Sequence, residues 1–413
     1  MAQVLRRRDF ALIWGAQLIS SIGDWVVWIA LPFYIYERTG SALATGTMFV
    51  VETLPPVLLG SLAGVLVDQW DRKRTMVVAD LTRCLVFLLL PIIHAPGWFW
   101  VIYPLAFVQS AVAQFFSPAQ SALIPTLVGK EHLLAANTLN SISGDLTMLV
   151  GPALGGVLYG RLGLTGVLLV DSASFLVSGV MILLVSTLPD PTEIQAGATL
   201  SVTNVWRDWL AGLCWVKNTS LIATLLTVRG LTMLGQGIVN VLWVAYVREI
   251  LKGSALEYGG VQVAVAAGGL VGALIVGHAS KILPPGRLVA LSEIAIGLIL
   301  LATFNLPSLP VILALQVVIG IPATVFSATH RTLLQASAGD RYLGRVFGAL
   351  STTNALLILG GEVLASLGGD HLGIVHMLNV SAGLNLLSGV VALVGLFNVR
   401  SVQGEPVSDL PGG

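Results

Sequence analysis

Five ionisable residues lie inside long apolar stretches of the chain, where a charged group needs either a partner or a task. They are Asp24, Glu52, Asp145, Arg229 and Glu362. A charge at the centre of a bilayer costs about 2.5–3.5 kcal/mol on insertion scales. Burial favours the neutral form of a carboxyl group, whereas a nearby arginine favours the charged form. These acids therefore either couple protons or bind substrate, or they are structural. A structural acid is either part of a salt bridge, for which Arg229 is the obvious counter-ion, or a buried protonated carboxyl.

The depth of these residues separates them into two groups. At about 1.5 Å of rise per helical residue, Glu362 lies closer to the outer surface, and a central group comprises Asp24, Glu52, Asp145 and Arg229. Asp145 precedes a glycine- and proline-rich segment that begins at Gly151. We expect protonation of Asp145 to be coupled to movement of that segment.

A second set of ionisable residues is predicted nearer the cytoplasm. Asp80 and Glu293 are separated by 213 residues, which predicts that they are equivalent positions in a repeat. Arg83 lies one helical turn after Asp80, and we expect these two to form a packing bridge.

The composition requires a membrane to position these residues. Of the 413 residues, 55% are hydrophobic and only 10% are charged, against about 25% charged in an average globular protein. A helix crosses the hydrocarbon with roughly 20 apolar residues. Twelve such stretches are predicted, at 10–35, 43–67, 75–95, 99–124, 134–159, 164–187, 219–246, 257–280, 288–306, 309–334, 343–367 and 373–398.

The chain also repeats itself at an offset of about 210 residues. Without a gap, Phe116-Ser117 aligns with Phe326-Ser327, and Ser178-Gly179-Val180 aligns with Ser388-Gly389-Val390. A repeat of this size made of apolar helices is typical of secondary transporters. We therefore predict an all-α membrane protein with twelve transmembrane helices in two pseudo-symmetric six-helix bundles. The predicted boundaries are 1–187 and 218–400 for the bundles, 188–217 for a cytoplasmic linker with a possible amphipathic helix, and 401–413 for a disordered cytoplasmic tail.

Basic residues are distributed unevenly between the predicted loops. With both termini in the cytoplasm, the outer loops carry only Arg38, Arg161, Arg248 and Lys252. The positive-inside rule then predicts a multi-pass protein of the cytoplasmic (inner) cell membrane. We expect it to act as a monomer among membrane lipids.

Several other functions find no support in the sequence. A formal net charge of zero argues against a nucleic-acid partner. Neither cysteine, Cys84 or Cys214, has metal-ligand or disulfide spacing, and the six histidines form no metal motif. No nucleotide-binding loop or nucleophile elbow is present. We therefore expect no enzyme activity, no metal and no cofactor.

The loop between the second and third stretches resembles the signature loop of the major facilitator superfamily. It runs from Gly64 through Asp68 to the basic turn Arg72-Lys73-Arg74. Glycine permits close helix approach, and an acid at a helix end can pair with guanidinium groups. The resemblance implies that Asp68, Arg72 and Arg74 form a gating latch on the cytoplasmic side.

The fifth stretch contains a segment that resembles the antiporter motif of the same superfamily. The segment consists of Gly151, Pro152, Gly155 and Gly156, with Ala153 and Leu154 between them. Small residues and a proline allow a helix to bend and pack closely on a neighbour. The alternative is ordinary glycine-rich helix packing. The resemblance implies export coupled to protons.

Finer resemblance is to the macrolide-efflux and enterobactin-exporter branch. It is carried by Ser21 to Trp25, Ala79 to Arg83, Phe116 to Ala119, and Asp171 to Phe175. One fold serves many cargoes, so the resemblance implies a kind of transport and not a cargo.

Aromatic residues predict the chemical character of the cargo. We expect Trp25, Trp28, Phe116 and Trp243 to line a cavity. Apolar walls with a few carboxylates suit lipophilic, often cationic, compounds. We therefore predict a proton-coupled exporter of lipophilic or amphipathic small molecules that works by alternating access. The alternatives are a carrier of lysophospholipids or lipid intermediates, and a membrane sensor that does not transport.

Overall fold

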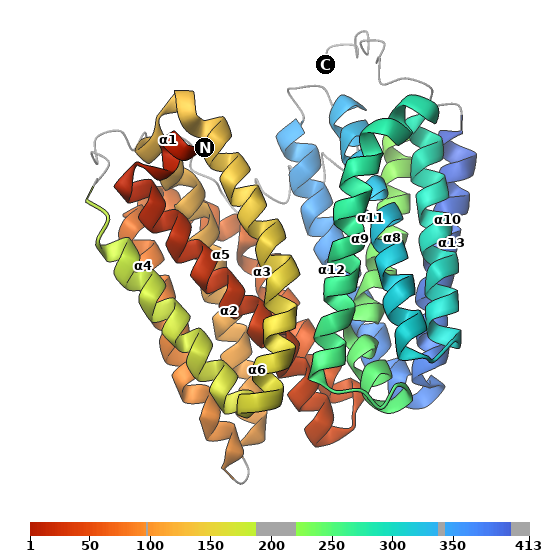
Figure 1. Ribbon diagram of the computed structural model, residues 1–413, viewed down its shortest axis with the longest axis horizontal. Coiled ribbons are helices and arrows are strands. Elements are labelled where there is room, and N and C mark those ends of the chain that lie inside the picture. The colour runs from red at the N-terminus through yellow and green to blue at the C-terminus, as the bar shows by residue number, and fades with distance from the viewer. Residues whose placement is uncertain (96–97, 187–219, 338–342, 398–413) are drawn as a thin grey trace, which may run out of the picture. The chain divides into compact units, whose positions relative to one another are not determined.

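The computed structural model describes residues 1–95, 98–186, 220–337 and 343–397, and every long element in them is a helix (Figure 1). Eleven of these helices are long and apolar enough to cross a membrane. The long helices are α2 (Arg8–Thr39), α3 (Ala42–Gln69), α4 (Arg72–Leu89), α5 (Ile102–Val128), α6 (Leu133–Leu183), α8 (Ser220–Ala245), α9 (Ala255–Ile282), α10 (Pro285–Asn305), α11 (Leu309–Ser337), α12 (Leu343–Leu372) and α13 (Ile374–Leu396). A short helix α1 (Ala2–Leu5) precedes them, and short 3₁₀ turns occur at Leu90–His94, Phe99–Val101 and Lys130–His132.

The helix α6 contains two of the predicted membrane spans. Its 51 residues are interrupted at Gly163, which has φ 66° and ψ −175° and is the only non-helical residue within it. The predicted spans 134–159 and 164–187 are thus joined at a single residue, and the chain has twelve spanning segments in its described part. The prediction of an all-α membrane protein is confirmed.

The end of α2 and the start of α3 are both capped by local hydrogen bonds. Gly40 ends α2 in the left-handed conformation, and its N–H donates to the Tyr36 carbonyl at 2.8 Å. Glycine is favoured there because other residues rarely adopt a positive φ. The next residue, Ser41, begins α3 by accepting a hydrogen bond from the Ala44 N–H at 3.3 Å. Together the two caps allow a tight turn between these helices.

The chain divides into two compact units. The first comprises Met1–Val202 with Val247–Val263, and the second comprises Thr203–Tyr246 with Ala264–Gly413. The start of α9 therefore belongs to the first unit. The predicted linker 188–217 and tail 401–413 lie outside the described residues.

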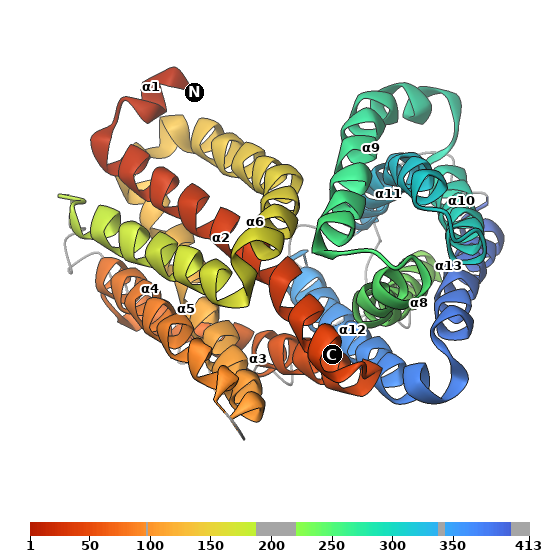
Figure 2. The ribbon, with the colours of Figure 1, turned by 60° about the horizontal axis from the view of Figure 1, so that its bottom comes forward.

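Within the first unit, α2 packs along α6, and α4 packs against both α5 and α6. Figure 2 shows α2 lying between the two halves of α6. Within the second unit, α8 packs against α12 and α13, and α10 packs against α13 and α11.

Two hydrophobic clusters form the core of the first unit. One contains Leu31, Phe87 and Phe175 among others, and the other contains Phe10 and Phe116. Phe116, predicted to line a cavity, is 9% exposed and packs in the second of these clusters. The polar site described next lies on α2, α4, α5 and α6, the helices that supply these clusters.

Candidate functional site

An ion pair joins α2 to α4 in the first unit. The guanidinium of Arg83 donates to the carboxylate of Asp24. The two side chains differ in accessibility, since that of Asp24 is 42% exposed and that of Arg83 only 9%. The helical spacing predicts a packing bridge from Arg83 to Asp80, but the ion pair that the structure shows joins Arg83 to Asp24 on α2.

The guanidinium of Arg83 is held by two further groups. Its carbon lies 4.0 Å from the centre of the Phe175 ring on α6, which is a cation–π contact. With its amide oxygen turned towards the guanidinium, Gln109 on α5 accepts from Nε at 2.9 Å and from Nη2 at 3.1 Å. Arg83 is therefore the common partner of groups from α2, α5 and α6.

A second aspartate, Asp171 on α6, lies beside this pair. It is fully buried, and its Oδ1 accepts from the Ser174 hydroxyl at 2.9 Å. Asp171 is in electrostatic contact with Asp24, Arg83 and Asp80. A Cβ atom at Gly23 on α2 would lie 1.9 Å from Asp171 Oδ1. Glycine at position 23 therefore lets the carboxyl of Asp171 lie against the backbone of α2.

Asp80 completes the polar cluster of the first unit, and a similar arrangement occurs in the second. Asp80 is fully buried and accepts from the Ser178 hydroxyl at 2.5 Å.

In the second unit Glu293 is fully buried near the hydroxyls of Thr232 and Ser388, with Arg229 in electrostatic range. Ser178 and Ser388 are the serines aligned by the internal repeat. The structure thus places a buried acid beside the same serine in each repeat.

The other predicted site residues lie elsewhere. Asp145 is exposed on α6 and forms no hydrogen bond or ion pair with any described residue. Glu52 on α3 is half-buried and in electrostatic contact with Tyr258 on α9. In the second unit, Arg229 is half-buried over the Phe326 ring, and Glu362 on α12 is 1% exposed. A proton- or cargo-binding role for each stays a prediction.

The glycine-rich segment of α6 packs closely on two neighbours. A Cβ at Gly151 would lie 2.3 Å from the Trp25 Cβ on α2, and Gly155 faces the backbone of the same helix. A Cβ at Gly156 would lie 2.6 Å from the carbonyl oxygen of Ala255, at the start of α9. Gly259 reciprocates, because a Cβ there would lie 2.2 Å from the Pro152 oxygen. We call the contacts of Gly156 and Gly259 the α6–α9 seam.

Aromatic side chains lie beside the seam. Trp28 stacks on Tyr258 with 6.5 Å between ring centres, and its edge contacts Trp25 at 5.2 Å. Trp243, in the second unit, is 5% exposed and stacks on Tyr246 at 5.5 Å. Whether these tryptophans line a cargo cavity stays a prediction.

Polar contacts continue beyond the seam to the end of α2. Arg248 Nη2 donates to Glu37 Oε1 at 3.0 Å, and the Tyr159 hydroxyl donates to the second oxygen of Glu37 at 2.7 Å. The Tyr36 hydroxyl donates to Glu249. Residues 248 and 249 belong to a π-helical turn, Tyr246–Ile250, that follows α8. These contacts were not predicted, since no residue pattern in the sequence relates the end of α2 to the turn after α8.

The basic loop before α4 contacts the ends of neighbouring helices in the first unit. Arg72 donates to the Ala122 carbonyl at 3.2 Å, and Lys73 donates to the carbonyls of Leu183 and Val185 at 2.9 and 2.7 Å. Lys73 thus satisfies backbone oxygens at the end of α6. Asp68 is exposed and forms no hydrogen bond or ion pair with any residue the structure describes. At Gly64 a Cβ would meet no described atom within 4 Å, so close packing does not explain that glycine here.

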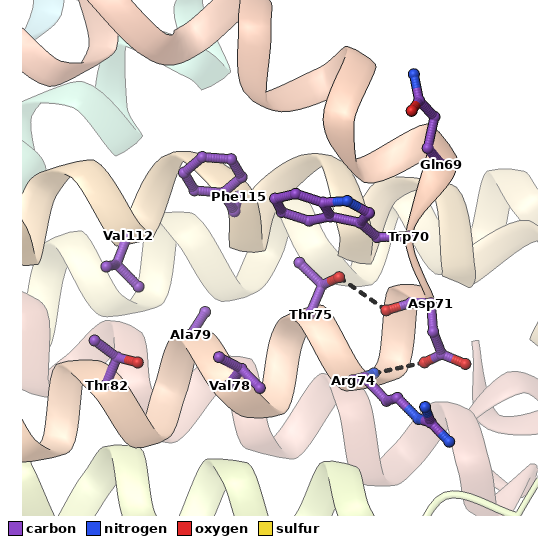
Figure 3. Close-up of a pocket in the computed structure, with 10 residues that line it drawn as sticks. All are labelled: Gln69, Trp70, Asp71, Arg74, Thr75, Val78, Ala79, Thr82, Val112 and Phe115. Atoms are coloured by element: carbon purple, nitrogen blue, oxygen red, sulfur yellow. Dashed lines mark hydrogen bonds between the residues drawn. The ribbon is translucent and has the colours of Figure 1, made fainter.

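A pocket of about 570 Å³ opens beside this loop (Figure 3). Asp71 begins α4 by accepting from the Arg74 N–H at 2.7 Å, and the Thr75 hydroxyl donates to the Asp71 carbonyl at 2.8 Å. Trp70 stacks on Phe115, with 5.7 Å between ring centres, and forms one wall. The gating role that the motif implies for Arg72 and Arg74 stays a prediction.

Asp171 is the site residue that the sequence analysis missed. It was recognised only as part of a motif and not as a buried ionisable group. Asp171, Ser174 and Ser178 recur at helical spacing, which places them on one face of α6. An acidic residue that shares one face of an apolar helix with serines is the pattern that would identify a buried ionisable site.

The fold and its polar site define a major facilitator superfamily transporter, and comparison with known proteins agrees. The sequence matches the transmembrane secretion effector family over residues 2–410, and the chain belongs to that family. It is 25% identical to macrolide efflux protein A of Streptococcus pyogenes, over 92% of this chain and 94% of the relative. It is 26% identical to the multidrug efflux pump Tap of Mycolicibacterium fortuitum, over 94% and 96%.

Solved structures show the same fold. A bacterial homologue of the iron transporter ferroportin, crystallised in an inward-facing state, superposes with a TM-score of 0.73 at 17% identity, over 94% of this chain and 98% of that one. The nucleoside transporter NupG superposes with a TM-score of 0.69 at 12% identity, over 94% and 99%. The chain is therefore a multi-pass membrane transporter and not an enzyme.

Proposed function

We propose that the chain exports lipophilic cations in exchange for protons, by alternating access. The observation that carries this proposal is the Asp24–Arg83 pair. The half-exposed carboxylate of Asp24 is accessible to a ligand, while its cationic partner Arg83 is buried against the ring of Phe175. A cation that reaches Asp24 competes directly with Arg83 for the same carboxylate.

The relatives support export of small molecules. Macrolide efflux protein A and the pump Tap are named for drug efflux, and both match along almost the whole chain. The resemblance of the Gly151–Gly156 segment to the antiporter motif adds support for exchange against protons. We further propose that both termini lie in the cytoplasm, as the distribution of basic residues predicts.

In this proposal the α6–α9 seam is the contact that must open and close during transport. Gly156 and Gly259 allow the backbones of α6 and α9 to meet there with little side-chain interdigitation. Such a surface can separate without moving bulky side chains out of each other's way.

Transport by the purified full chain in liposomes tests the proposal. An imposed pH gradient should drive accumulation of ethidium, a lipophilic cation, and accumulation should cease when an ionophore removes the gradient. Asp24→Asn should abolish it. Glu131→Gln, which neutralises an exposed acid just before α6, should transport like the parent.

Two results would contradict the proposal. Accumulation of ethidium that ignores the pH gradient would exclude proton exchange. Movement of lysophosphatidylcholine, but not of ethidium, without any gradient would support a lipid carrier instead.

A further inference from the structure

The polar cluster of the first unit holds more acids than it can neutralise. Asp24, Asp80 and Asp171 share one cation, Arg83, and Gln109 is the polar residue that α5 adds. No other charged group on these helices faces Asp171 in the described part of the chain. If all three acids were ionised, the buried cluster would carry a net charge of −2, which is costly inside a membrane.

The contacts support an assignment of the protons among the three acids. Asp24 takes the ion pair with Arg83 and is half-exposed, so it is the ionised member. Asp80 and Asp171 are fully buried, and each leaves one carboxyl oxygen, Oδ1 of Asp80 and Oδ2 of Asp171, without a hydrogen-bonding partner among the described residues. A buried, partnerless carboxylate oxygen is unfavourable. The neutral acid avoids this cost.

Asp171 differs from Asp80 in its access to the ion pair. The carboxyl of Asp171 lies against Gly23, the residue next to Asp24 in the chain. The ring of Phe175, which holds the Arg83 guanidinium, is one helical turn from Asp171 on the same helix. Asp80 accepts from Ser178 at 2.5 Å, a shorter bond than the 2.9 Å bond that Asp171 accepts from Ser174. The guanidinium therefore lies between one exposed acid and one buried acid.

We propose that Asp171 holds the proton that is exchanged for cargo, and that Arg83 moves from Asp24 to Asp171 when a cationic cargo binds Asp24. The Asp171 O–H bond then breaks, its electron pair stays on the carboxylate that Arg83 neutralises, and the proton leaves to water along the exposed face of Asp24. One monovalent cation enters and one proton departs, so the charge of the cluster is unchanged. This inference rests on the proposed function, because it assumes a cationic cargo.

The proton itself can be tested without any cargo. In infrared difference spectra of the purified chain titrated with base, we expect a band of protonated carboxylic acid that Asp171→Asn removes and the exposed-site control Glu131→Gln retains. Arg83→Gln should shift the loss of this band to higher pH, because the cation that favours the ionised acid is gone. An unchanged band in Asp171→Asn, or an unshifted one in Arg83→Gln, would overturn the assignment. Arg83→Gln keeps the test decisive if Asp171→Asn fails to fold.

Proton release on binding tests the exchange. In weakly buffered solution, tetraphenylphosphonium should bind to the parent with release of a proton for each cation, and to Asp171→Asn without release. Equal release from both proteins would overturn the inference, as would loss of release in the control Glu131→Gln. If tetraphenylphosphonium fails to bind the parent, the cationic cargo of the proposed function is wrong, and the infrared result alone decides whether Asp171 holds the proton.

Discussion

The close contacts of the α6–α9 seam predict how much a single added methyl group should destabilise the protein. In Gly156→Ala, the new Cβ would lie 2.6 Å from the Ala255 oxygen and 2.8 Å from the Leu256 Cα. Carbon contacts are optimal at about 3.5–4.0 Å, so the two backbones must separate by about 1 Å. Both atoms belong to backbone and cannot rotate away. We expect a loss of about 1–3 kcal/mol in the free energy of unfolding, the usual cost of overpacking.

The same helix offers a matched control. Gly160 lies one turn further along α6, and a Cβ there would meet no described atom within 4 Å. Gly160→Ala should therefore keep or raise stability, because alanine is the better helix former by up to about 1 kcal/mol. For a unit of this size, the melting temperature of Gly156→Ala should be lower than that of the parent by about 2–12 °C.

The assay is thermal unfolding of the purified variants in one detergent, followed by size-exclusion chromatography. Gly259→Ala should be destabilised in the same way, since its Cβ would lie 2.2 Å from the Pro152 oxygen. Both substitutions separate the same surfaces, so the double variant should lose less than the sum of the two single losses. Equal melting temperatures for Gly156→Ala and Gly160→Ala would show that the seam is not formed in the purified protein, and fully additive losses would show that the two glycines do not share one contact.

Three further changes test other contacts. Asp24→Asn removes the carboxylate that pairs with Arg83 and should cost less than about 3–5 kcal/mol, the cost of breaking a fully buried pair, because the Asp24 side chain is 42% exposed and Asp171 is near enough to pair with Arg83 instead. Adding Arg83→Gln should restore part of the loss in thermal unfolding, and a double variant no more stable than Asp24→Asn would argue against the ion pair. Lys73→Met removes two charge-assisted hydrogen bonds to carbonyls at the end of α6. It should lower the free energy of unfolding by about 1.5–3 kcal/mol, measured as a lower denaturation midpoint. An unchanged midpoint would mean that water replaces the amine fully. Glu37→Gln should cost no more than about 1 kcal/mol, because the side chains of Glu37 and Arg248 are 39% and 42% exposed, and the loss should vanish in high salt; a loss that persists there would indicate a role beyond the exposed ion pair.

The sequence predicted the helices well because hydropathy acts on every residue of a span. All twelve predicted segments have helical counterparts, and the break at Gly163 falls between the predicted spans 134–159 and 164–187. The repeat predicted that Asp80 and Glu293 are equivalent, and each lies beside an aligned serine. These inferences depend only on local chemistry and on periodicity.

The partners of the ionisable residues were much harder to predict. The spacing within α4 suggested a bridge from Arg83 to Asp80, but the ion pair crosses to Asp24 on α2. Hydropathy cannot give the rotation of an apolar helix, because lipid and the protein interior are equally apolar. For the same reason Asp145 was favoured by depth alone, although its side chain is exposed, while the fully buried Asp171 was passed over.

The single-residue break at Gly163 has a consequence for how the protein is made. The two spans of α6 are joined without a loop, and only a glycine adopts φ 66° there without strain. Each span crosses about 30 Å of hydrocarbon, so with both spans in place Gly163 lies at one membrane surface. We expect the two to enter the bilayer together during synthesis, as one hairpin. Lengthening this connection with a flexible insert would uncouple the two insertion events.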